Sequence, residues 1–126
     1  MKHIRVGLIG FGTVGSGLAR TLFEQQERLR RKVGTDIVLA RVADINIETL
    51  PDQFNNVILT RDANDIFNDP SIDIVVELIG GIEPARTFIL KAIAGGKHVV
   101  TANKALLAVH GTEIFTAAQQ KGVMVA

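Results

Sequence analysis

The 126-residue sequence predicts an α/β fold, in which a doubly wound parallel sheet lies between two layers of helices. Strand-like and helix-like patterns alternate along the whole chain, which is typical of parallel strands joined by helical crossovers. The run 72–79 is almost continuously apolar, as expected for a strand covered on both faces. The first strand-like run, 4–9, leads directly into a glycine-rich turn at 10–15, and a helical pattern opens behind it.

That turn reads Gly-Phe-Gly-Thr-Val-Gly, the G-x-G-x-x-G pattern of a dinucleotide site, in the strand–turn–helix setting that such a site needs. Gly10 is expected to turn the chain off the strand, Gly12 to admit a pyrophosphate, and Gly15 to let the helix pack closely. The free N–H groups at the helix start would then face the phosphates. The alternative is an ordinary tight turn, but the flanking pattern favours a Rossmann-type sheet.

The remaining elements are predicted from their residue patterns. Leu18, Leu22 and Leu29 recur at helical spacing, so one long first helix is expected to reach Gly34. Further strands are expected at 37–43, 57–60, 72–79 and 98–102, and further helices at 63–67, 84–94 and 112–121. Segments 45–56 and 105–109 are expected to be irregular. Residues 123–126 resemble the opening of a sixth strand, so we expect residues 1–126 to be one domain, truncated there, at the amino terminus of a longer chain.

Composition excludes several classes of partner. A formal charge of +1 and the absence of Trp and Tyr argue against nucleic acid. No apolar run is long enough to span a membrane, and the absence of cysteine fits a cytoplasmic protein and excludes a thiolate metal site. The basic cluster 28–32 is interpreted as a solvated helix end. His3, His98 and His110 lack the spacing of metal ligands, so no metal is expected.

Unusual residues follow four of the predicted strands, and parallel strands bring their carboxyl ends to one edge of the sheet. Asp44 follows the second strand, where an acidic residue binds the adenosine ribose and disfavours a 2′-phosphate. We therefore expect NAD to be preferred over NADP, with Arg41 and Arg61 as competing phosphate contacts. Asp44 follows Gly10 by more than the usual ~20 residues, because the first helix is long. The alternative is that Asp44 only caps the following turn.

Two further residues at this edge are candidates for chemistry. Asn103 is expected to cap a helix, which places Lys104 at a helix start, where a cation is disfavoured by the helix dipole. That position suggests a functional lysine, although a surface lysine without a role is the alternative. Glu77 lies near the end of an apolar strand and must find a partner if it is buried. A structural role and a ligand-binding role are equally compatible with its position.

The chain resembles homoserine dehydrogenases in four segments. These are the glycine turn 10–15, Val-Glu-Leu-Ile-Gly-Gly at 76–81, Gly-Lys-His-Val-Val-Thr-Ala-Asn-Lys-Ala-Leu-Leu-Ala at 96–108, and His-Gly at 110–111. The Thr-Ala-Asn-Lys segment is far more specific than the glycine pattern. Members of that family interconvert L-homoserine and aspartate 4-semialdehyde with NAD or NADP, on the route to threonine and methionine.

The resemblance implies a role for individual residues. Residues 11–14 would wrap the pyrophosphate, and Lys104 matches a family lysine beside the nicotinamide and the substrate. The predicted cofactor-binding residues are Gly10, Phe11, Gly12, Thr13, Val14, Gly15, Asp44, Ile79, Gly80, Gly81, Thr101, Ala102, Asn103 and Lys104. Lys104 is also the predicted catalytic residue. A substrate-binding and dimerising region, with a second lysine and an aspartate, is expected beyond residue 126, so this segment alone is expected to be inactive and the complete enzyme a homo-oligomer.

Two other functions are compatible with a cofactor domain of this kind. One is another reductase of the aspartate pathway, or a sugar-type oxidoreductase, but those lack the Thr-Ala-Asn-Lys-Ala-Leu-Leu-Ala continuation. The other is a non-catalytic module that senses NAD(H) and signals to a partner protein. Such a sensor would need a surface for its partner, and no exposed apolar stripe is evident in the sequence.

Overall fold

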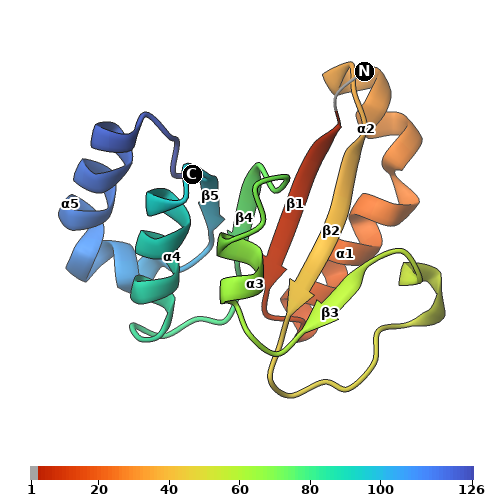
Figure 1. Ribbon diagram of the computed structural model, residues 1–126, viewed down its shortest axis with the longest axis horizontal. Coiled ribbons are helices and arrows are strands. Elements are labelled where there is room, and N and C mark those ends of the chain that lie inside the picture. Colours follow the sequence, from red (N-terminus) through yellow and green to blue (C-terminus); the bar gives the residue numbers. More distant parts are fainter. Residues whose placement is uncertain (1–2) are drawn as a thin grey trace.

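The computed structural model describes residues 3–126 and contains a five-stranded parallel sheet (Figure 1). The strands are β1 (Ile4–Ile9), β2 (Ile37–Ala43), β3 (Ile58–Thr60), β4 (Ile74–Glu77) and β5 (His98–Thr101). Their spatial order is β3-β2-β1-β4-β5, so the order reverses between β1 and β4. This is the doubly wound arrangement predicted from the sequence.

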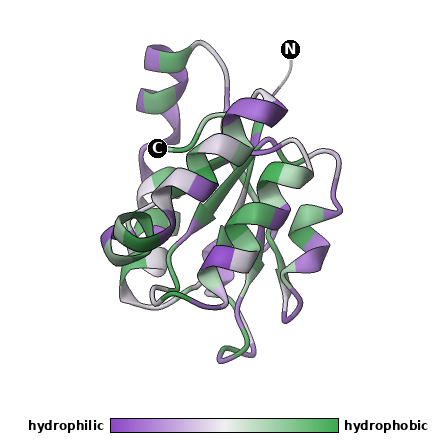
Figure 2. Ribbon diagram, turned by 90° about the vertical axis from the view of Figure 1, so that its left-hand side faces the viewer, coloured by the Kyte–Doolittle hydropathy of each residue, from purple (hydrophilic) through white to green (hydrophobic). Residues whose placement is uncertain are grey.

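Helices cover both faces of the sheet and enclose two apolar cores. They are α1 (Thr13–Glu24), α2 (Gln26–Val33), α3 (Asn64–Phe67), α4 (Ala85–Ala94) and α5 (Lys104–Lys121), with a 3₁₀ turn η1 (Asp52–Phe54). One core joins α3, α4 and α5 to one face of the sheet, and the other joins α1 and the η1 residue Phe54 to the opposite face. In Figure 2 the central strands are mostly green, whereas the surrounding helices carry both colours. The structure is therefore the predicted three-layer α/β/α arrangement.

Three predicted element boundaries are wrong. The expected long first helix is interrupted at Gln25, which has φ −102° and ψ 16° and separates α1 from α2. The apolar segment 105–109 belongs to α5, whose only departure from helical geometry is at His110 (φ −119°, ψ 15°). Strand β4 is shorter than expected, because only Ile74–Glu77 pair with β1 and β5. In each case the apolar pattern continues across the boundary, so the pattern alone cannot locate it.

The last residues of the chain lie beside β5. Val125 forms a parallel bridge with Val99, and the Val99 N–H donates to the Met124 carbonyl at 2.9 Å. The predicted sixth strand is thus present as a single bridge. Among residues 3–126, no helix combines the length and the apolar character that crossing a bilayer requires.

Candidate dinucleotide-binding site

The glycine turn joins the end of β1 to the start of α1 in a conformation that larger residues could not adopt. Gly10 has φ 100°, a left-handed conformation that favours glycine. A Cβ atom on Gly15 would lie 2.0 Å from the carbonyl oxygen of Gly10, whereas one on Gly12 would meet no atom within 4 Å. Gly15 therefore lets the helix approach the turn, as predicted, and Gly12 borders open space.

Within residues 3–126, no side chain caps the amino end of α1. Gly12 is its N-cap residue and offers no side-chain oxygen, and the first turn carries no acidic residue. The first N–H groups of a helix lack intrahelical partners, and the helix dipole places partial positive charge beside them. This end of α1 is therefore suited to an anionic group such as a phosphate.

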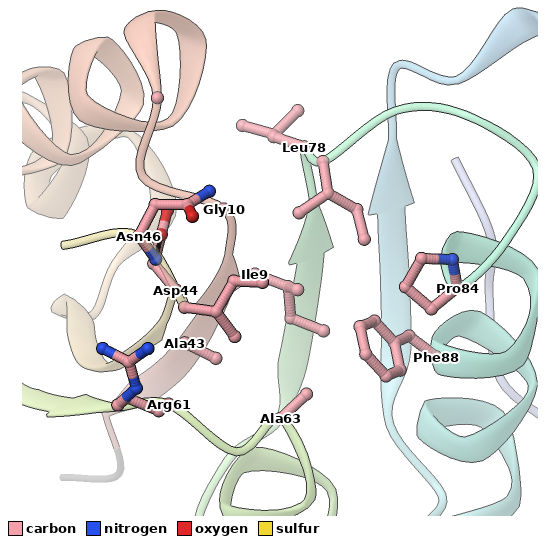
Figure 3. A pocket seen from close by; sticks show the side chains of 13 residues that line it. Ile9, Gly10, Ala43, Asp44, Asn46, Arg61, Ala63, Leu78, Pro84 and Phe88 are labelled. Carbon is pink, nitrogen blue, oxygen red and sulfur yellow. Dashed lines mark hydrogen bonds between the residues drawn. The ribbon is translucent and has the colours of Figure 1, made fainter.

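A pocket of about 410 Å³ opens at the carboxyl ends of β1, β2 and β4, across the point where the strand order reverses (Figure 3). Of the predicted site residues, it brings together Gly10, Gly12, Asp44 and Ile79. Pro84 and Phe88 lie across the pocket from Gly10 and Asp44. Its remaining lining residues are Ile9, Ala43, Ile45, Asn46, Arg61, Ala63 and Leu78.

Asp44 connects the end of β2 to the glycine turn. One carboxylate oxygen accepts a 2.7 Å hydrogen bond from the Phe11 N–H, and the other accepts one of 2.7 Å from the Asn46 N–H. Asp44 therefore does cap the turn that follows it, as one of the two interpretations held, but it also anchors the glycine turn. Because each carboxylate oxygen has a second lone pair, these bonds leave acceptor capacity at the edge of the pocket.

The two arginines considered as phosphate contacts have different surroundings. The Arg41 Nε donates to the Asp69 carboxylate at 2.9 Å. The Ser71 hydroxyl, and after it Arg41, hold the pKa of Asp69 far below its usual range by donating hydrogen bonds to it. Arg61 lines the pocket, is exposed, and points its guanidinium toward Asp44 and Asn46 in Figure 3. Of the two, only Arg61 lies where it could contact a bound nucleotide.

Ten predicted residues do not line the pocket. Phe11, Thr13, Val14 and Gly15 belong to the glycine turn and the start of α1, and the other six lie at the ends of β4 and β5: Gly80, Gly81, Thr101, Ala102, Asn103 and Lys104. Asn103 caps α5 as predicted, because its side-chain oxygen accepts from the Leu106 N–H at 3.1 Å. Lys104, the first residue of α5, is exposed and forms no side-chain hydrogen bond or ion pair within the described residues 3–126. Its ammonium group is therefore available to a ligand at the carboxyl edge of the sheet.

Glu77 has a structural environment. Its side chain is 1% exposed and its carboxylate accepts hydrogen bonds from the N–H groups of Ile79 and Gly80 and from the hydroxyl of Thr101. The buried carboxylate has the partners that its burial requires. Glu77 therefore organises the carboxyl ends of β4 and β5 without being open to a ligand.

A family model described as homoserine dehydrogenase, NAD binding domain, matches residues 10–126. The chain belongs to this family. The homoserine dehydrogenase of Pseudomonas aeruginosa is 48% identical over 126 residues, covering 100% of this chain and 29% of that protein. That of Methylobacillus glycogenes is 54% identical over 109 residues, which are 86% of this chain and 26% of that protein.

The homoserine dehydrogenase family also supplies close structural neighbours. A crystal structure of the enzyme from Thiobacillus denitrificans matches 100% of this chain and 29% of that one, with a TM-score of 0.93 and 52% identity. This NAD-binding domain thus spans less than a third of the length of each of these three homoserine dehydrogenases. The match to the family establishes a nicotinamide cofactor as the ligand class of the domain.

The homoserine dehydrogenase domain also has pocket residues that the sequence analysis missed. Ala63, Leu78, Pro84 and Phe88 reach the pocket from segments that come together only in the fold. Apart from the position of Leu78 next to a strand end, no sequence signal distinguishes them from core residues.

His98 accepts a hydrogen bond from the Met124 N–H, and no group of three metal-ligating side chains is present in the described part of the chain.

Proposed function

We propose that this chain is the cofactor-binding part of an oxidoreductase that interconverts L-homoserine and aspartate 4-semialdehyde. The observation that carries the proposal is the pocket across the strand-order reversal, which the glycine turn, Asp44 and Ile79 all line. A dinucleotide binds at this place in doubly wound sheets. Membership of the homoserine dehydrogenase family supplies the substrate pair.

The adenosine and pyrophosphate parts of the cofactor belong to the half of the sheet that contains β1, β2 and β3. Residues 11–14 would hold the pyrophosphate, because the uncapped start of α1 and the open space at Gly12 admit an anion there. Asp44 would accept hydrogen bonds from the ribose hydroxyls, and its negative charge would repel a 2′-phosphate. We therefore propose that NAD is preferred, with Arg61 as the residue that permits NADP.

The nicotinamide end belongs to the half that contains β4 and β5. Ile79, Gly80, Gly81, Thr101, Ala102 and Asn103 would border the ring. When bound there, a nicotinamide would supply the hydride chemistry. The unpaired ammonium of Lys104 would stabilise the negative charge that develops on the substrate oxygen during the transfer.

The complete protein is proposed to contain more than this domain, since the chain spans 29% of the Pseudomonas aeruginosa relative. The remainder would bind the substrate and form a homo-oligomer, and the enzyme would act in the cytoplasm. Residues 1–126 alone are then expected to bind nucleotide without oxidising homoserine. Measurable homoserine oxidation by the purified domain would contradict the assignment of substrate binding to the rest of the protein.

Titration with NADH and NADPH tests the cofactor assignment. The chain contains no Trp or Tyr, so nicotinamide fluorescence can be followed without interference from the protein. NADH is expected to bind more tightly, and Arg61→Ala should weaken NADPH more than NADH. Arg41→Ala is the matched control, because Arg41 is paired with Asp69 and lies outside the pocket lining. Failure of the domain to bind either nucleotide would contradict the proposal, and tighter binding of NADPH would reverse the assigned preference.

A further inference from the structure

The carboxyl ends of β4 and β5 are joined by a buried carboxylate. Glu77 and Thr101 are register partners on these adjacent strands, and the Thr101 hydroxyl donates to Glu77 Oε1 at 2.7 Å. The N–H groups of Ile79 and Gly80 both donate to Glu77 Oε2 at 3.0 Å. One side chain therefore fixes the loop after β4 against the end of β5.

Asn103 joins the same two segments from the other side. Its backbone N–H donates to the Thr101 hydroxyl oxygen at 3.0 Å, and its side-chain N–H₂ donates to the Gly81 carbonyl at 2.6 Å. Its side-chain oxygen caps α5 at the Leu106 N–H. Together with Glu77 and Thr101 it forms a closed ring of hydrogen bonds around the loop 79–81, which we call the Glu77 network.

The directions of these hydrogen bonds are determined by the chemistry of the groups. The carboxylate accepts three hydrogen bonds, and the single hydroxyl proton of Thr101 is used on Glu77. The hydroxyl oxygen then accepts from Asn103. Within the described residues 3–126, no Lys, Arg or His side chain lies within ion-pairing distance of Glu77. The carboxylate is therefore held entirely by the groups whose position it determines.

The Glu77 carboxylate is buried and fully hydrogen-bonded. Glu77 is 1% exposed, and its removal would leave two backbone N–H groups and a hydroxyl without their acceptor. What an apolar residue cannot do is bind two consecutive N–H groups of a loop and a hydroxyl on the next strand. The polar network therefore specifies a position, and Lys104 directly follows its Asn103 member.

We infer that Glu77 is a positioning residue for the nicotinamide end of the site, an inference that rests on the proposed function. The Glu77 network holds Gly80 and Gly81 in a set position relative to the start of α5, which carries Lys104, before any cofactor binds. Because the network lies on the β4–β5 half of the sheet, it acts on the nicotinamide half of the cofactor. It does not act on the adenosine half, which belongs to Asp44 and the glycine turn.

Binding of NADH and of ADP-ribose distinguishes the two halves of the site. ADP-ribose contains the adenosine, pyrophosphate and second ribose of NADH but lacks the nicotinamide. Glu77→Gln leaves an oxygen for the two loop N–H groups but turns a donor toward Thr101, and Glu77→Leu removes all three bonds. NADH affinity is expected to fall several-fold for Glu77→Gln and about tenfold for Glu77→Leu, which is ~1.4 kcal/mol, because the loop beside the nicotinamide loses its set position. ADP-ribose affinity is expected to stay within about twofold, because its sites lie on the other half.

Asp69→Asn is the matched control. The Asp69 carboxylate also accepts from a backbone N–H and a hydroxyl, both of Ser71, but it lies before β4, at the opposite edge of the sheet. This variant should leave the ratio of NADH to ADP-ribose affinity unchanged. If the Glu77 variants weakened NADH and ADP-ribose binding by the same factor, or weakened neither, the inference would be wrong. Failure of the unmodified chain to bind ADP-ribose would instead contradict the proposed function.

Amide hydrogen exchange gives a readout that needs no ligand and stays informative if binding is weak. In Glu77→Gln the N–H groups of Ile79, Gly80 and Leu106 should exchange faster, while those of β1 and β2 keep their protection. Leu106 is the critical probe, because it contacts Asn103 and not Glu77. Unchanged exchange at Leu106 would show that Glu77 does not position the start of α5.

Discussion

Replacing Gly15 and Gly17 by alanine, one at a time, should change stability in opposite directions within the same helix. Both residues lie in α1 (Thr13–Glu24), so the intrinsic gain from Gly→Ala in a helix, up to about 1 kcal/mol, applies to each. A Cβ on Gly17 would have only the tip of the Arg20 side chain nearby, at 4.0 Å. Gly17→Ala is therefore expected to stabilise the chain.

The Cβ of Gly15→Ala would lie 2.0 Å from the Gly10 carbonyl oxygen, whereas such atoms normally stay about 3.3 Å apart. Since the obstacle is backbone, α1 must shift by roughly 1 Å, and overpacking of this kind costs about 3 kcal/mol or more. After the helix-propensity gain, a net loss of about 2 kcal/mol remains, which corresponds to a Tm lower by roughly 8 °C.

Far-ultraviolet circular dichroism during urea and thermal unfolding measures both variants, because the chain has no Trp or Tyr for fluorescence. The midpoint should fall for Gly15→Ala and rise for Gly17→Ala, with similar urea m-values for the two. If Gly15→Ala proved as stable as Gly17→Ala, the close approach of α1 to the glycine turn would be wrong.

Four further results are expected. Gly12→Ala should cost under ~1 kcal/mol of stability, because its Cβ meets no atom within 4 Å. It should nevertheless weaken NADH binding by obstructing the pyrophosphate, and an unchanged NADH affinity would contradict that role. The lowered pKa of Asp69 means that this carboxylate stabilises the fold above its unfolded pKa of ~3.9 and loses that contribution as the pH falls toward its folded pKa. Asp69→Asn should therefore flatten the loss of stability that urea melts measure between about pH 5 and 2. The Lys97 ammonium donates to the backbone carbonyls of Asp69 and Ile72 at 2.6 and 2.9 Å. Lys97→Met should therefore lower the free energy of unfolding by about 1–3 kcal/mol, and an unchanged value would show that these bonds are dispensable. In the complete enzyme, Lys104→Ala should reduce turnover far more than NADH affinity, whereas a redox sensor would have no turnover to lose.

The chemistry at strand ends was more predictable than the boundaries of the helices. The glycine turn, the β2 strand with Asp44 behind it, and the Asn103 cap all follow from local patterns and were found where expected. The interruption of the first helix at Gln25 was not predicted, because the apolar stripe continues through it. The start of α5 at Lys104 was missed for a related reason, since an apolar segment without clear periodicity does not distinguish a helix from a loop.

The two open alternatives at Asp44 and Glu77 depended on groups far along the chain. The sequence cannot show that an Asp44 oxygen meets the Phe11 N–H while the other caps the turn, because the two residues are brought together by the pairing of β1 with β2. Likewise, the choice between a ligand-binding and a structural Glu77 depended on Thr101, its register partner on β5. Arg41 and Arg61 became distinguishable only in the fold, because Arg41 pairs with Asp69 and Arg61 lines the pocket.

By itself, the sequence determined the fold class, the cofactor class and the family. The fold class, the cofactor class and the family follow from local periodicity and short motifs, in which each residue acts through its immediate neighbours in the chain. The tertiary structure decided which of these residues share a pocket, which charges are already paired, and that Glu77 faces inward to bind a loop and the next strand. Such outcomes depend on strand order and register, which bring together residues tens of positions apart, and no local pattern carries that information.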